Sequence, residues 1–166
     1  SDFKYMIRPQ IDPQAYLFAQ VDVKDADFIK LPEGDAAFLV DSAFIANRTF
    51  SMQDKQQKLF FGSDPQVDVK LTTLDKASDE TGFLMGKKHY RWGWKVAINN
   101  LKAHKIDVLM EDAAPQIRDE RIKLKEIVDA TAPKKEDNVL KWTFSVPAHA
   151  EKTLEYGFSI TYPDDL

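Results

Sequence analysis

Cysteine is absent from this chain of 166 residues, and glycine occurs only six times. Without thiols the chain has no disulfides, no thiolate nucleophile and no thiolate metal ligand. Gly82 and Gly86, the closest pair of glycines, do not form a phosphate-binding loop ahead of a helix. Disulfide scaffolds and nucleotide sites of that kind are therefore not expected.

Long apolar runs and an excess of positive charge are also missing. The densest apolar segments, residues 36–40 and 59–61, are far shorter than the roughly 20 residues that a membrane-spanning helix needs. The formal net charge of -4 gives no positive field to attract phosphates or anionic headgroups. Neither a transmembrane segment nor a nucleic-acid partner is expected.

The composition that remains is that of a folded domain. Hydrophobic residues make up 43% and charged residues 30%, a balance that favours a packed core over a disordered tail. The length fits one domain spanning residues 1–166. Because the chain opens on Ser1-Asp2 without a starting Met, we interpret it as a processed chain or a domain cut from a longer protein.

Apolar side chains alternate with polar or small ones in three long stretches, which predicts strands with one buried face. Their apolar positions are Leu154, Tyr156, Phe158, Ile160 and Tyr162; Tyr90, Trp92, Trp94, Val96 and Ile98; and Leu140, Trp142, Phe144 and Val146. Shorter alternations cover residues 67–71, 106–110 and 122–124. Residues 15–23 begin apolar on both faces, which indicates a central strand covered on both sides.

Turn residues separate these stretches at short, fairly even intervals. They are Pro32-Glu33-Gly34, Asp41-Ser42, Gly62-Ser63-Asp64-Pro65, Asn99-Asn100 and residues 133–138. Residues 38–40 and 44–50 fit a tight hairpin, and residues 99–104 fit a looser one before the strand at 105–111. The polar stretch 75–82 is expected to be a loop. About ten strands without a helix predict an all-β, antiparallel β-sandwich that is immunoglobulin- or fibronectin-like with extra strands.

The order of these segments resembles a known bacterial family. The pieces that carry the resemblance are Leu31-Pro32-Glu33-Gly34 before residues 38–41, Phe60-Phe61-Gly62-Ser63-Asp64 before residues 67–69, Tyr90-Arg91-Trp92 through Asn99-Asn100, residues 108–115 with Ile122, and Leu140-Lys141-Trp142 followed by residues 156–163. The chain is similar to the C-terminal domain of unknown function in mucoidy inhibitor A-like proteins. It departs from that family after Pro115, where Gln116, Ile117 and Arg118 replace a small hydroxyl residue.

This resemblance implies an architecture and a location, but no catalytic residues. Members look like exported proteins with an N-terminal β domain, a coiled coil and then this domain. A location in the periplasm or cell envelope is what the resemblance implies.

The three histidines are the first candidates for chemistry, since imidazole is a common metal ligand and general base. His89 lies on the polar face of its strand, His104 in the expected hairpin loop and His149 after Pro147. No two of them have ligand spacing, so we expect surface or turn histidines.

Two acidic groups and a hydroxyl pair are the other candidates. Asp22, Asp25 and Asp27 suggest a calcium loop, but the glycine and bidentate acid of an organised cage are missing. The acids around Pro115 suggest a hydrolytic pair and are more simply solvated; they are Glu111, Asp112, Asp119 and Glu120. Thr143 and Ser145 belong to no Ser-His-acid arrangement. We therefore predict no catalytic residue, no metal site and no cofactor.

Two classes of function remain open. The first is a non-catalytic structural or protein-interaction module, whose partners include other domains of its own full-length chain. The second is a carbohydrate-binding module that uses exposed aromatic rings. Tyr90, Trp92 and Trp94 distinguish the two, and we expect their face to be core because it continues into Val96 and Ile98. The lysine pairs at 87–88 and 134–135 are expected on an edge strand or in loops.

Overall fold

The computed structural model of the protein describes residues 3–22, 34–40, 43–50, 56–74, 87–128 and 131–163. Within these ranges the chain forms strands and turns without a helix, and so no described helix is long and apolar enough to cross a membrane. The strands are β1 (Phe3–Arg8), β2 (Asp12–Asp22), β3 (Gly34–Val40), β4 (Ala43–Phe50), β5 (Gln56–Ser63), β6 (Val67–Leu74), β7 (Lys87–Asn100), β8 (Ile106–Ala113), β9 (Lys123–Val128), β10 (Lys134–Glu136), β11 (Val139–Val146) and β12 (Glu151–Pro163).

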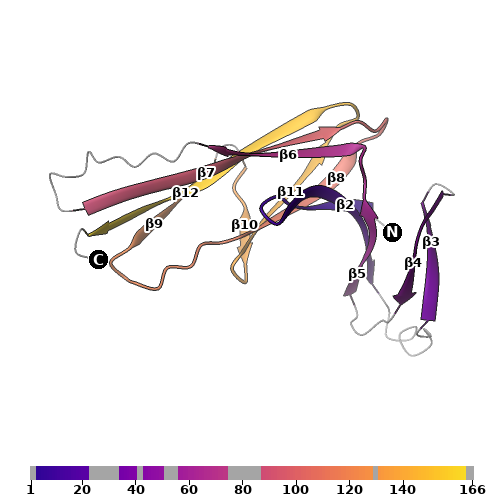
Figure 1. Ribbon diagram of the computed structural model, residues 1–166, viewed down its shortest axis with the longest axis horizontal. Coiled ribbons are helices and arrows are strands. Elements are labelled where there is room, and N and C mark those ends of the chain that lie inside the picture. The colour runs from indigo at the N-terminus through magenta and orange to yellow at the C-terminus, as the bar shows by residue number, and fades with distance from the viewer. Residues whose placement is uncertain are drawn as a thin grey trace.

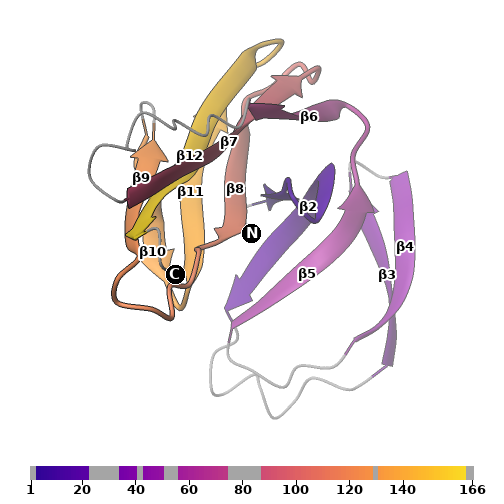
Figure 2. The ribbon, with the colours of Figure 1, turned by 60° about the vertical axis from the view of Figure 1, so that its left-hand side comes forward.

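Ten of these strands form two sheets, and Figures 1 and 2 show that the sheets pack against each other. One sheet has the order β10-β11-β8-β1-β2-β5 and the other the order β6-β7-β12-β9. The remaining two strands, β3 and β4, pair with each other as the expected hairpin. The all-β sandwich predicted from the alternation is confirmed. One pair departs from the antiparallel expectation, because β1 and β8 run parallel.

The core lies between the two sheets and consists of the apolar positions that alternate along the strands. Val96 and Ile98 of β7 belong to the same core cluster as Val108 and Met110 of β8, and all four are completely buried. Trp142 of β11 is 1% exposed and donates its indole N–H to the Thr131 carbonyl oxygen at 3.0 Å. Complete burial of side chains of this size supplies most of the free energy that holds such a sandwich together.

Strand β2 is covered on both faces, as its sequence predicts. It lies between β1 and β5 in the larger sheet. Ala15 belongs to the main core, whereas Phe18, which is completely buried, contacts the Phe60 ring with centroids 5.6 Å apart. Two layers of apolar contact therefore fix this strand in the sheet.

Two connections, one predicted as a turn and the other as a hairpin, carry the chain from one sheet to the other. The turn at Gly62-Ser63-Asp64-Pro65 joins β5 of the larger sheet to β6 of the smaller one. Residues 101–105 join β7 of the smaller sheet to β8 of the larger one. Turn residues indicate only that the chain reverses, so they do not distinguish a hairpin from a crossover.

The segment predicted as a turn at 133–138 is a strand and a tighter turn. Residues 134–136 form β10, and only Asp137 and Asn138 connect it to β11. Both have positive φ, at 47° and 63°. Two successive positive φ values make a type I′ turn, whose twist suits a two-residue hairpin.

Candidate functional site

A pocket lies where the two sheets meet at one corner of the sandwich, and residues of both sheets line it. Its volume is about 220 Å³. The start of β2 forms one wall with Pro13 and Ala15, and β6 forms the other with Val67 and Val69. The crossover residue Asp64 closes one end, and its backbone N–H donates to the Ala15 carbonyl oxygen at 3.0 Å. The walls are therefore held by both sheets.

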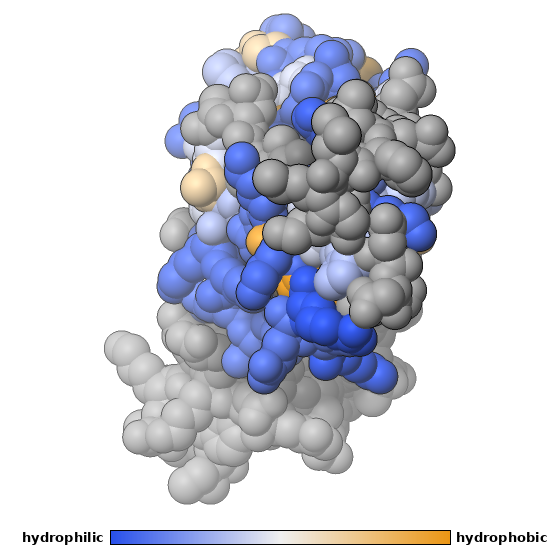
Figure 3. All heavy atoms as spheres, turned by 90° about the vertical axis from the view of Figure 1, so that its left-hand side faces the viewer, coloured by the Kyte–Doolittle hydropathy of each residue, from blue (hydrophilic) through white to orange (hydrophobic). Residues whose placement is uncertain are grey.

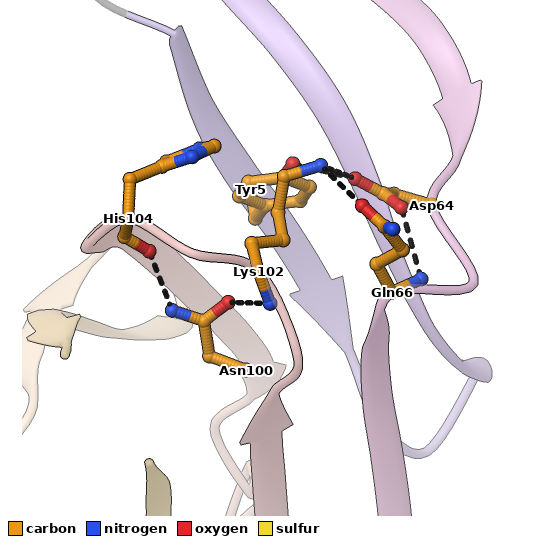
Figure 4. A network of polar contacts seen from close by, with 6 residues as sticks. All are labelled: Tyr5, Asp64, Gln66, Asn100, Lys102 and His104. Atoms are coloured by element: carbon orange, nitrogen blue, oxygen red, sulfur yellow. Dashed lines mark hydrogen bonds and ion pairs between the residues drawn. The ribbon is translucent and has the colours of Figure 1, made fainter. Parts of the chain in front are cut away.

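A network of polar contacts adjoins this pocket through Asp64 and is drawn in Figure 4. Asp64 accepts hydrogen bonds from Tyr5 of β1 and from the Lys102 ammonium group, each at 2.7 Å through Oδ2. Lys102 also donates to the Gln66 side chain at 3.2 Å. The Lys102 and Asp64 side chains are only 17% and 16% exposed. This ion pair ties one crossover to the other.

Asn100, the last residue of β7, completes the network and is fully buried. Its side-chain amide donates to the carbonyl oxygens of His104, Val146 and Pro147 at 2.8–3.2 Å. Its side-chain oxygen accepts the backbone N–H of Lys102 at 3.1 Å. The Asn100 side chain thus satisfies backbone groups in the crossover that follows β7 and at the end of β11. The sequence predicted only a turn residue here.

Asp64 is held as a carboxylate by its partners. Partial burial by itself raises its pKa, but hydrogen bonds from Lys102, Tyr5 and the Gln66 backbone N–H outweigh burial and hold the pKa below its ordinary value. The charge of Asp64 is therefore committed to the network.

A second polar contact joins the sheets near the opposite end of β8. Tyr156 of β12 donates to Asp112 Oδ2 at 2.5 Å, and Gln10 donates to the same oxygen. Burial, followed by the hydrogen bond to Asp112, raises the pKa of Tyr156 above its ordinary value. This tyrosine therefore remains a neutral donor.

The three histidines are exposed and separate, as expected from the sequence. His89 Nδ1 lies 2.8 Å from Thr161 Oγ1 on the neighbouring strand. His104 contributes its backbone oxygen to Asn100, and His149 occupies a tight turn with φ of 52°. Within the described ranges, no group of three or more His, Asp or Glu side chains could hold a metal ion.

The acids around Pro115 do not converge. Glu111 accepts two hydrogen bonds from Arg8, at 2.9 and 3.1 Å, and lies 3.8 Å from the Lys58 ammonium group. Asp119 pairs with Arg121, whose hydrogen bonds hold the pKa of Asp119 below its ordinary value. The proposed calcium loop falls outside the described residues: Asp25 and Asp27 are not described, and of Asp22 only the backbone is.

The remaining candidates lie on strands. Ser145 donates to Asp107 Oδ1 at 2.5 Å across the β11–β8 pair. Lys134 and Lys135 lie on β10, the edge strand of the larger sheet, where Lys134 pairs with Glu136. Lys87 and Lys88 begin β7, and the loop expected at 75–82 lies outside the described residues.

The aromatic residues of β7 lie on its core-facing side, but they are less buried than the residues nearer the Asn100 end of the strand. Trp92 and Trp94 pack against the core cluster and are half-buried. Their rings contact those of Phe158 and Tyr156 on β12, with centroids 6.1 and 5.5 Å apart. Figure 3 views the molecule from the side where β7 begins, and its coloured residues are mainly hydrophilic with isolated apolar ones.

Sequence reasoning missed the corner pocket and the network behind it. Tyr5 and Asp64 are 59 residues apart, and Asp64 and Lys102 are 38 apart. Only the crossovers bring them together, and the sequence predicts no more than a turn at the first crossover and a hairpin at the second. The pair Asn99-Asn100 gave an indication of the network. An asparagine that follows the apolar residues of a buried strand face can use its side-chain amide to satisfy backbone groups at the strand end.

Comparison with known proteins places almost the whole chain in one family. A family model described as a domain of unknown function, DUF4139, matches residues 9–164. Neither the curated proteins nor the solved structures gave a match to the chain.

Proposed function

The chain belongs to the DUF4139 family of domains of unknown function, and from that premise we propose that it is a non-catalytic protein-interaction module of a longer bacterial envelope protein. One observation carries this proposal. The polar side chains of Asp64, Glu111, Asp112 and Ser145 are engaged in contacts that join strands or crossovers.

The corner network and the Glu111 contacts illustrate this use of polar groups. Asp64 with Lys102 joins two crossovers, and Glu111 with Arg8 joins β8 to β1. A catalytic carboxylate or base must instead be able to reach a substrate proton. Groups that are already bonded inside the sandwich support a scaffold that presents its surfaces and edges to partners.

The envelope location rests on the resemblance to mucoidy inhibitor A-like proteins. In that arrangement this domain, as the unit formed by residues 1–166, follows a coiled coil at the C-terminal end of an exported chain. Its nearest partners are then other domains of the same protein. Fractionation of cells that express the full-length protein tests the location, and recovery from the cytosol alone would contradict it.

The test of the interaction role uses the isolated domain as immobilised bait in a detergent extract of the envelope, with heat-denatured domain as the control. We expect the folded bait alone to retain a defined protein or the remainder of its own full-length chain. Retention of the same proteins by both baits, or of none by either, would overturn the proposal.

A carbohydrate-binding module is the second candidate, favoured by the half-buried Trp92 and Trp94. Aromatic rings bind sugars when a flat face is accessible. A glycan array with the wild type and with Trp92→Ala separates the two proposals. Glycan binding that disappears in the variant would favour the second candidate.

A further inference from the structure

Strand β6 ends the smaller sheet and leaves one side of its backbone unpaired within the described part of the chain. Val67 pairs with Asn100 and Leu74 with Gly93, and the Gln66 carbonyl oxygen accepts from the Leu101 N–H at 2.9 Å. Because antiparallel hydrogen bonding alternates, the even-numbered residues of β6 face β7 with their backbone groups. Val69, Leu71 and Thr73 therefore direct N–H and C=O groups toward the free side.

The corner pocket lies against the inner face of this strand. Val67 and Val69 line it from β6, and Pro13 and Ala15 line it from β2. The alternate residues Asp68, Lys70 and Thr72 are exposed, and Asp68 also borders the rim of the pocket. An added strand would therefore place one side chain in the pocket and the next on the solvent side.

The other free edges of the two sheets are less suited to an added strand. Strand β10 has three residues, two of them lysines, and β9 carries Lys123 and Lys125 on its exposed face. Strand β5 is irregular, because its register with β2 shifts between Leu17 and Phe18 and Gly62 has φ of 110°. Short strands, lysines and irregularities discourage pairing with another chain.

The charge near the pocket indicates what kind of segment fits. Asp64 is engaged by Lys102, whereas the exposed Asp68 has no hydrogen-bond or ion-pair partner among the described residues. A cation on an incoming strand next to Asp68 would form a cross-strand pair of opposite charge.

We propose that the free edge of β6 and the corner pocket bind an extended segment of a partner protein, which adds as a strand with an apolar side chain in the pocket and a lysine or arginine beside Asp68. This binding mode rests on the proposed interaction role and specifies its surface. Main-chain hydrogen bonds to β6 supply affinity, and the pocket supplies selectivity.

The probe is a capped synthetic peptide with the sequence Thr-Val-Lys-Leu-Lys-Val-Thr, titrated to about 1 mM into the labelled domain, a concentration that detects weak binding. We expect amide shifts confined to residues 14–15, 64 and 66–73. Methylation of every second backbone nitrogen of the peptide should abolish binding when the methylated nitrogens are those that face β6. Methylation of the other set of nitrogens should leave binding intact. Shifts at β5, β9 or β10, or none at all, would overturn the proposal.

A charge exchange tests the assignment of Asp68. Asp68→Lys should weaken binding of the lysine peptide about tenfold, and a peptide with glutamates in place of its lysines should bind this variant better than the wild type. Glu120→Lys, an exposed change of equal charge outside the pocket, is the matched control and should leave binding unchanged. Equal loss in both variants would overturn the proposal by showing unspecific charge attraction.

Two further outcomes separate this inference from the proposed function. If the same shifts appear without peptide as protein concentration rises, a second copy occupies β6 and the partner assignment is wrong. If Asp68→Lys bait retains its envelope partner undiminished, the interaction role stands and the β6 surface is overturned. Loss of that partner in Asp68→Lys alone would support both.

Discussion

The two ends of β7 obey the same alternation but differ in burial. At the Asn100 end, Val96 and Ile98 are completely buried, and Asn100 is locked to the next crossover and to β11. At the opposite end, Tyr90 and Trp92 are half-buried. Figure 1 shows why, since β7 and β12 extend to the left beyond β8 and β11. Alternation thus identifies a face, whereas the length of the opposing sheet decides how much of it is covered.

The largest difference between the two ends of β7 should appear when a side chain on the core-facing side is shortened to alanine. Ile98→Ala should lower the free energy of unfolding by about 2–5 kcal/mol, because the cavity forms in a closed part of the core. Tyr90→Ala should cost about 1 kcal/mol, since water already reaches that ring. Urea denaturation of both variants measures the comparison, and equal costs would break it.

Removal of the lock at the Asn100 end should have the next largest effect. Asn100→Ala leaves three carbonyl oxygens and the Lys102 N–H without their side-chain partner. A cost of about 3 kcal/mol is expected, because buried polar groups lose bonds that water cannot replace. His89→Ala at the exposed end is the control. A fully stable Asn100→Ala domain would show that the lock is dispensable.

The middle of β7, where the completely buried end meets the half-buried end, should be destabilised by the addition of a single methyl group. Gly157 of β12 pairs with Gly93 of β7, and a Cβ on Gly157 would collide with the Trp92 carbonyl oxygen and lie 2.8 Å from the Gly93 Cα. Gly157→Ala should therefore cost about 2 kcal/mol. At Gly93 the nearest atom would be 3.3 Å away, so Gly93→Ala should cost less. Thermal melts of both variants test this order.

The smallest expected effect is a dependence on pH at the locked end. The folded-state pKa of Asp64 lies below its ordinary value, so its stabilisation is present above the unfolded pKa and is lost as the pH falls through the folded value. Below about pH 4 the wild type should therefore lose part of its advantage over Asp64→Asn. Urea midpoints across pH 2–7 measure this loss. A constant difference across that range would contradict the assignment.

The strands could be predicted from the sequence, whereas their partners could not. Period-two alternation located β7, β11 and β12, because one buried face is a local property. Sheet membership depends on contacts between distant residues, such as Tyr5 with Asp64 or the parallel pairing of β1 with β8. The pocket follows from those contacts, so no local pattern marked it.

Hydrogen exchange along β7 tests the central claim most directly. The claim is that the core completely buries the Asn100 end of β7 and covers the Tyr90 end only in part. Amides of Val96 and Ile98 should exchange near the rate of global unfolding, and those of Tyr90 and Trp92, which face β12 in the same way, much faster, through local opening. Uniform protection along the strand, or stronger protection at the Tyr90 end, would contradict the account.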